Sequence, residues 1–187
     1  MKTSYVFFAN GFEEIEALTV VDVLRRAGMP VVTVSIGETT LVEGAHGVTV
    51  QADSLYADNS YAEADWLILP GGMPGASNLA AHQELCAELM NHNRKGGHVA
   101  AICASPAIVL APLGIITGRN AVCYPGMDRN VSGVKWRFKP VAVCENVVTG
   151  NGPSAAAAFA LALVEQSAGK QVADEVAHAM LLFNDED

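Results

Sequence analysis

A cysteine at the end of a predicted strand is the clearest chemical signal in this sequence. Cys103 follows the apolar run at 99–102 and precedes two small residues, Ala104 and Ser105, and then Pro106. Ser105 and Pro106 are typical of a helix start, so the thiol is expected at the sheet edge where open α/β folds bind ligands. Backbone amides and the helix dipole there favour the thiolate and lower the thiol pKa from about 8.5. The arrangement is similar to a nucleophile elbow without its flanking glycines, and it predicts a reactive cysteine, with a buried structural thiol as the alternative.

Glu16 is the acid expected to accompany that thiol. It lies four and eight residues before Val20 and Leu24, so a helix places its carboxyl group on the apolar face. A desolvated carboxyl group has a raised pKa and can remain protonated near neutral pH, where it donates a hydrogen bond to a thiolate or relays a proton. The alternative is a partly exposed carboxylate at a helix start. Glu13 and Glu14 are expected only to complement the helix dipole.

Two glycine-containing turns are expected to line the same edge. Gly71 and Gly72 end the strand-like segment at 64–72, and their backbone amides can approach an oxyanion closely because glycine has no side chain. A plain turn at the strand exit is the alternative. Gly152 and Pro153 likewise lie where an extended segment ends and a helix begins.

Strand and helix patterns alternate along the chain and must hold these residues in place. Strand-like runs cover 4–9, 29–36, 64–72 and 98–102, and helical patterns cover 12–28, 78–97, 105–116 and 153–169. The more polar segment 38–53 favours short strands at a sheet edge, 119–125 is strand-like, and 134–152 is expected to form a hairpin. Strands joined through helices pair in parallel with right-handed crossovers. We therefore predict one α/β domain of three layers over residues 1–187.

Composition narrows the class of protein. Of the 187 residues, 51% are hydrophobic and only 6% aromatic, so aliphatic side chains must build the core. The net charge of −9 disfavours nucleic acid and anionic membranes as partners. No stretch reaches the roughly 18 apolar residues of a membrane span, and no signal-peptide pattern is seen, which favours a cytoplasmic protein.

Cysteine and histidine spacing indicates neither disulfides nor a metal site. The four cysteines contain no C-x-x-C pair, and the five histidines show no ligand spacing. Cys86, Cys123 and Cys144 do not lie at a strand-to-helix turn like that of Cys103, so we expect them to be structural thiols. The segment KWRFK at 135–139 alternates basic and aromatic residues, which predicts a strand with one apolar and one solvated face rather than a nucleic-acid site.

Taken in order, these motifs resemble the ThiJ/PfpI superfamily and, within it, the branch of the Parkinsonism-associated protein deglycase. The resemblance runs nearly end to end through NGFEEIEALTVVDVLRRAG, LILPGGMPGASNL, NRKGGHVAAICASPAIVLA and GNGPSAAAAFALALVE. It implies a flavodoxin-like sandwich with a mostly parallel central sheet, usually a homodimer, with no metal or organic cofactor. It also implies that Cys103 is the reactive cysteine, that Glu16 is its protonated partner, and that Gly72 and Ala104 supply amides.

The resemblance implies two functions for a stress-response protein, and a departure from the family pattern at Tyr124 adds a third. The first is a glyoxalase or deglycase acting on reactive dicarbonyls or their protein adducts, and the second is an oxidation sensor or chaperone that forms a Cys103 sulfinate. The third is a dimeric scaffold with a vestigial pocket. Relatives carry a histidine where Tyr124 precedes Pro125, so Tyr124 is the candidate hydroxyl donor. Ala104 occupies the position of the histidine found in the protease-like branch, which disfavours a peptidase.

Overall fold

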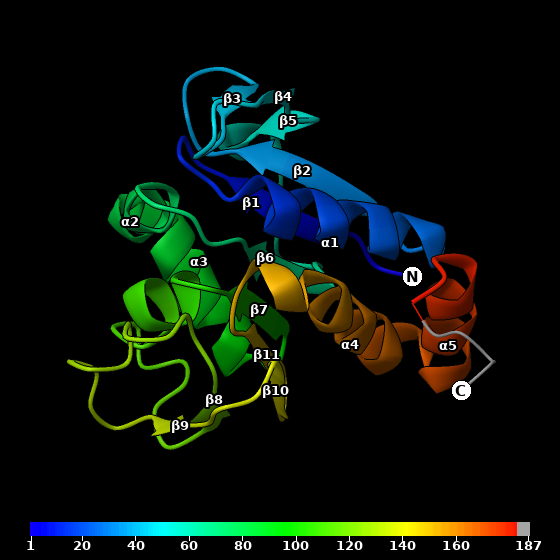
Figure 1. The fold of residues 1–187 in the computed structure, drawn as a ribbon. Helices are drawn as coiled ribbons and strands as arrows, with labels where there is room; N and C mark the ends of the chain where they lie inside the picture. The colour runs from blue at the N-terminus through cyan, green and yellow to red at the C-terminus, as the bar shows by residue number, and fades with distance from the viewer. Residues whose placement is uncertain (183–187) are drawn as a thin grey trace.

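A seven-stranded β-sheet runs through the middle of the molecule (Figure 1). The structure is a computed structural model, and it describes residues 1–182. The strands of the sheet are β1 (Ser4–Phe8), β2 (Val31–Ser35), β5 (Ser54–Leu55), β6 (Trp66–Leu69), β7 (His98–Ile102), β10 (Val141–Cys144) and β11 (Val147–Gly150). Their order is β10-β11-β7-β6-β1-β2-β5, and only β10 and β11 pair antiparallel. The predicted mostly parallel sheet is confirmed.

Helices cover both faces of this sheet. They are α1 (Glu14–Arg26), α2 (Gly75–Ala81), α3 (Gln83–Arg94), α4 (Ala156–Ala168) and α5 (Lys170–Ala179). Shorter helical segments are two 3₁₀ turns, Tyr56–Asp58 and Pro153–Ala155, and a π-helical turn, Pro106–Leu110. One face is covered by α1 and α4, which pack against each other, with α5 against α4; the other is covered by α2, α3 and the π-helical turn (Figure 1). The three predicted layers are therefore present.

Alternation along β1 explains how two cores form. Val6 and Phe8 point to one face of the sheet and pack with Leu24 of α1. Phe7 points to the other face and packs with Leu85 of α3. All five of these side chains are at most 1% exposed, because parallel strands between two helical layers bury both of their faces.

Two small sheets lie outside the central one. A hairpin of β3 (Leu41–Glu43) and β4 (Thr49–Gln51) forms from the segment predicted to hold short edge strands. A parallel pair forms from β8 (Asn120–Ala121) and β9 (Lys135–Trp136). A bridge between Phe12 and Gly44 ties the first hairpin to the chain just before α1.

The single continuous helix predicted over 78–97 is wrong. The chain forms α2 and then α3, and His82 separates them with φ −80° and ψ 95°. Its Nδ1 accepts a hydrogen bond from the Leu85 amide at 3.1 Å, so an imidazole caps α3 as a short polar side chain ordinarily does. Leu85 and Leu89 of α3 are fully buried against the sheet.

The helix predicted over 105–116 differs in type and in its cap. The Ala111 amide bonds the Pro106 carbonyl five residues back, as in a π-helix. Pro112 offers no N–H for a regular ladder, which interrupts an α-helix here. Ser105 has helical backbone angles and makes no side-chain cap, contrary to expectation.

Elements in the C-terminal third are shorter or more numerous than predicted. The strand at 119–125 shrinks to β8, and the hairpin at 134–152 shrinks to β10 and β11. Phe138, expected on an apolar strand face, is 97% exposed because β9 ends two residues earlier. Periodicity did not predict α5, which starts directly after Gly169, the residue that ends α4 at φ 90°. Within residues 1–182, no helix is both long and apolar enough to cross a membrane.

Candidate functional site

Cys103 lies at the carboxyl end of β7 in a strained backbone conformation. Its φ is 64°, a left-handed value that is costly for any residue with a side chain and that is concentrated at functional sites. Its amide donates to the Gly150 carbonyl at 3.0 Å, and its carbonyl accepts from the Tyr124 amide at 2.7 Å. The predicted elbow is therefore present, and hydrogen bonds to two other segments hold it.

Glu16 reaches this elbow from the first turn of α1. The residue is 0% exposed, so the alternative of a partly exposed carboxylate is wrong. Its Oε2 accepts a hydrogen bond from the Gly71 amide at 2.8 Å. A Cβ added to Gly71 would lie 2.7 Å from that oxygen and 3.0 Å from the Cys103 Sγ. The carboxyl group and the thiol therefore face each other across a space that only glycine leaves open.

Burial governs the acid–base behaviour of this pair. Desolvation raises the pKa of Glu16 to about 7, against the Gly71 amide and the Cys103 thiol, which favour the carboxylate. Burial also raises the pKa of the Cys103 thiol to about 12, and the negative charge of Glu16 adds to the effect. The amides of Gly72 and Ala104 act in the opposite direction but are outweighed. The amides at the helix start act in the predicted direction, but the net shift is upward, so the predicted thiol pKa below the ordinary value is wrong.

Four of the other predicted site residues contact Cys103 or Glu16: Gly71, Gly72, Ala104 and Tyr124. Gly72 and Ala104 direct amides toward the Cys103 sulfur, as expected. The Gly71 amide is engaged by Glu16 rather than left for an oxyanion. Tyr124 contributes its backbone amide, and the residue is 46% exposed.

Gly152 and Pro153 follow β11, whose Gly150 carbonyl accepts the hydrogen bond from the Cys103 amide. The ring of Tyr124 packs over Gly152, where an added Cβ would be 3.4 Å from its Cδ2. Pro153 starts the 3₁₀ turn that leads into α4. The Tyr124 ring thus lies against the backbone at Gly152. The hydroxyl role of Tyr124 stays a prediction.

Two residues near the site have roles that the sequence did not indicate. Ser105 donates its hydroxyl to the Pro70 carbonyl at 2.6 Å, which ties the elbow to the β6 turn. Glu13 is the N-cap of α1, and its Oε2 accepts from the Glu16 amide at 2.8 Å. Glutamate is not among the usual N-cap residues, so the sequence carried no clear signal for this cap.

Comparison with known proteins agrees with this architecture. The model of the DJ-1/PfpI family matches residues 2–166. This chain belongs to the DJ-1/PfpI family. Protein dj-1beta of Drosophila melanogaster is 36% identical, over 97% of both proteins. Oxidized DJ-1 of Toxoplasma gondii superposes with a TM-score of 0.93 and 39% identity, covering 97% of this chain and 98% of that one. The fold is accordingly the flavodoxin-like sandwich of DJ-1 proteins.

Family members vary in length and in the activity for which they are named. The chain spans 47% of protein DJ-1 homolog A and 40% of protein DJ-1 homolog B of Arabidopsis thaliana, and it is 33% identical to each. A glutathione-independent glyoxalase of Caenorhabditis elegans, DJR-1.2, is 34% identical, over 85% of this chain and 84% of that protein. One relative of this chain is thus named for glyoxalase activity.

Proposed function

We propose that this chain is a cofactor-free stress-response enzyme that converts small α-oxoaldehydes to 2-hydroxy acids, and that it also acts on their protein adducts. The buried Cys103–Glu16 pair on a positive-φ elbow is the observation that carries this proposal. A thiol facing a carboxyl group whose pKa is near neutral is suited to nucleophilic addition with proton transfer. The similarity to the DJR-1.2 glyoxalase supports the same reaction class.

The reaction begins with proton transfer inside the pair. The Glu16 carboxylate accepts the thiol proton while sulfur adds to the aldehyde carbon, and it returns that proton to the new oxyanion to give a hemithioacetal. The amides of Gly72 and Ala104, which lie near the sulfur, stabilise the oxyanion. Sulfur thus gains a carbon bond without a free thiolate accumulating first.

Glu16 then isomerises the adduct, and water completes the cycle. The carboxylate removes the proton on the former aldehyde carbon, and an enediol forms. Return of that proton to the neighbouring carbon leaves a thioester. Water cleaves the carbon–sulfur bond, releasing the 2-hydroxy acid and regenerating the Cys103 thiol. The sum is one oxoaldehyde and one water converted to one hydroxy acid, so no external oxidant or reductant is consumed.

Lactate formation from methylglyoxal tests the enzyme. Purified wild type is expected to form lactate, and Cys103→Ser is expected to lose this turnover. Cys123→Ser is the matched control, because Cys123 is 9% exposed against 8% for Cys103 and burial raises its thiol pKa to about 12 as well. Equal turnover by wild type and Cys103→Ser would refute the proposal.

Tyr124→Phe tests the proposed hydroxyl donor separately. If the hydroxyl supplies a proton in the reaction, its removal lowers kcat by about 10²-fold, the lower end of general acid–base contributions. The phenyl ring retains the packing over Gly152. Unchanged kcat in Tyr124→Phe would assign proton transfer to Glu16 alone.

The second candidate function is an oxidation sensor with chaperone activity. It is favoured by the similarity to a DJ-1 solved in oxidized form and by the amides of Gly72 and Ala104, which can hold a sulfinate. Two equivalents of peroxide convert the thiol to a sulfinic acid and yield two waters. After mild peroxide, intact mass is expected to rise by two oxygen atoms in wild type but not in Cys103→Ser. An unmodified Cys103 under conditions that oxidise the other thiols would contradict this function.

A homodimer is the quaternary structure we propose. Exposed apolar side chains gather where α1 starts and where the β3–β4 hairpin lies beside it: Ile15, Leu18, Leu41 and Val48 are 41% to 61% exposed. A surface of this kind is typical of contact with another protein. Sedimentation velocity is expected to give a dimer for wild type and a monomer for Leu18→Glu, and a monomeric wild type would contradict the proposal.

A further inference from the structure

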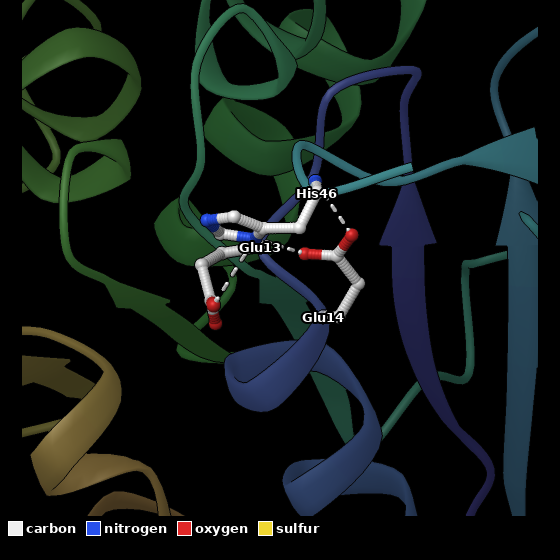
Figure 2. A group of neighbouring side chains, drawn as sticks. All are labelled: Glu13, Glu14 and His46. Atoms are coloured by element: carbon white, nitrogen blue, oxygen red, sulfur yellow. Dashed lines mark hydrogen bonds and ion pairs between the residues drawn. The ribbon is translucent and has the colours of Figure 1, made fainter. Parts of the chain in front are cut away.

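Three metal-ligating side chains meet at the N-terminus of α1, where it lies against the β3–β4 hairpin. Glu13 and Glu14 come from the start of α1, and His46 comes from the turn between β3 and β4. One ligand atom from each lies within 4.8 Å of the others. Figure 2 shows the Glu14 carboxylate directed at the imidazole and the Glu13 carboxylate joined to the ring by a longer dashed line.

Each carboxylate is held by a backbone amide at one oxygen and leaves its other oxygen for the centre of the cluster. Oε2 of Glu13 accepts from the Glu16 amide at 2.8 Å, while Oε1 lies 3.9 Å from Nδ1 of His46. Oε1 of Glu14 accepts from the His46 amide at 2.7 Å, while Oε2 lies 2.7 Å from the same Nδ1. Hydrogen bonds that orient ligands in this way are the usual second layer of a metal site.

The turn that carries His46 is fixed against α1 by its backbone. The Gly11 amide donates to the Glu43 carbonyl at 2.7 Å, and the Ala45 amide donates to the Phe12 carbonyl at 2.8 Å. A Cβ on Gly44 would overlap the Glu14 carboxylate, so only glycine permits this approach. The imidazole is therefore placed by the fold, 32 residues along the chain from Glu14.

Charge and geometry point to a cation at this place. The side chains of Glu13 and Glu14 are only 9% and 10% exposed, and in this cluster they face the single imidazole of His46. Two donors bound to one Zn²⁺ at about 2.1 Å in tetrahedral geometry are separated by about 3.4 Å. The two separations from Nδ1, 2.7 and 3.9 Å, fall on either side of that value. A small adjustment of the side chains is enough to surround an ion.

We propose that Glu13, Glu14 and His46 form a binding site for a divalent transition-metal ion such as Zn²⁺. One imidazole with two carboxylates suits Zn²⁺, Ni²⁺ or Cu²⁺, whereas Mg²⁺ and Ca²⁺ prefer an all-oxygen site. In the single chain the His46 side chain is 71% exposed, which leaves room for a further ligand such as water. The proposal is independent of the proposed oxoaldehyde chemistry, which needs no metal.

Zn²⁺ titration by calorimetry tests this site. The full chain carrying Cys103→Ser is the background, since that substitution removes a competing thiol ligand. One equivalent of Zn²⁺ per chain is expected to bind. In the same background, His46→Ala and Glu14→Gln are expected to weaken binding at least about tenfold, the scale seen when even an orienting neighbour of a metal ligand is lost.

Glu43→Gln is the matched control. Glu43 is exposed on the same hairpin, and its backbone carbonyl accepts the hydrogen bond from the Gly11 amide. Its substitution removes one charge without removing a ligand, so Zn²⁺ affinity is expected to be unchanged. Zn²⁺ is also expected to raise the Tm of the background chain but not of His46→Ala, because a ligand that binds only the folded state stabilises it. No saturable binding, or equal affinity in His46→Ala, would overturn the proposal.

Discussion

The two sides of the first turn of α1 carry the same residue type in opposite states. On the inner side, burial raises the pKa of Glu16 to about 7. On the outer side, burial acts in the same direction on Glu14, but hydrogen bonds from His46 outweigh it and the pKa of Glu14 is lowered. Both residues are almost completely buried. The difference shows that the partner of a buried acid, rather than its burial alone, decides whether it holds a proton or a charge.

The largest expected consequence of this contrast is on stability. Because the folded-state pKa of Glu16 lies above the usual 4.5, the folded protein binds more protons than the unfolded chain between those pH values. Stability should therefore fall as pH rises from about 4.5 to about 7, by roughly 3 kcal/mol if the shift is fully realised. Urea midpoints measured across this range are expected to fall more steeply in wild type than in Glu16→Gln. Parallel pH profiles for the two proteins would contradict the raised pKa of Glu16.

Gly71→Ala should break the inner pair while leaving the outer cluster intact. The added Cβ would lie 2.5 Å from the Cys103 Cβ, so the thiol and carboxyl group must separate. Displacements of this size cost about 10²-fold in rate, which the methylglyoxal assay measures. Gly37→Ala is the control, because its nearest new contact is an ordinary 3.6 Å from the Ser35 hydroxyl. Full activity in Gly71→Ala would show that the close approach is not needed.

Glu16→Gln distinguishes a charged neighbour from a proton donor. The charge of Glu16 contributes to the raised pKa of Cys103, second only to burial, so its removal should lower that pKa and speed iodoacetamide alkylation at a fixed pH near 8. Each unit by which the pKa falls gives about tenfold more thiolate. Slower alkylation in Glu16→Gln would mean the reverse, that Glu16 keeps its proton and stabilises the thiolate. Glu43→Gln serves as the charge control.

The smallest effect on stability is expected from His46, which contacts Glu14 at the start of α1. The hydrogen bond to Glu14 raises the pKa of His46, so this pair stabilises the fold while His46 is protonated and loses that contribution as pH rises through the folded-state pKa. His46→Ala should therefore destabilise the protein more at pH about 6 than at pH about 9, a range on either side of the usual histidine value. A difference between the two proteins that does not change with pH would leave His46 without an ionic role in the absence of metal.

Local patterns were sufficient to predict the frame of the site. Cys103 was located by a strand that ends at small residues, and Glu16 by helical spacing, because both signals depend on neighbours in sequence. The direction of the thiol pKa was wrong because it depends on burial depth and on the charge of Glu16, which spacing does not measure. The approach of His46 to Glu14 also requires the fold, whereas the His82 cap is local and was missed because histidine is not among the usual N-cap residues. The contact between His46 and Glu14 joins residues 32 positions apart, and such a contact produces no periodic pattern in the sequence.

The elbow has a consequence for protein engineering. The hydrogen bonds that clasp it come from the Cys103 amide and carbonyl and from the hydroxyl of Ser105, and the sulfur takes part in none of them. The backbone conformation at position 103 therefore does not depend on which nucleophilic atom the side chain carries. Oxygen, sulfur and selenium nucleophiles placed there would share one direction of attack, so their intrinsic reactivities can be compared within one protein.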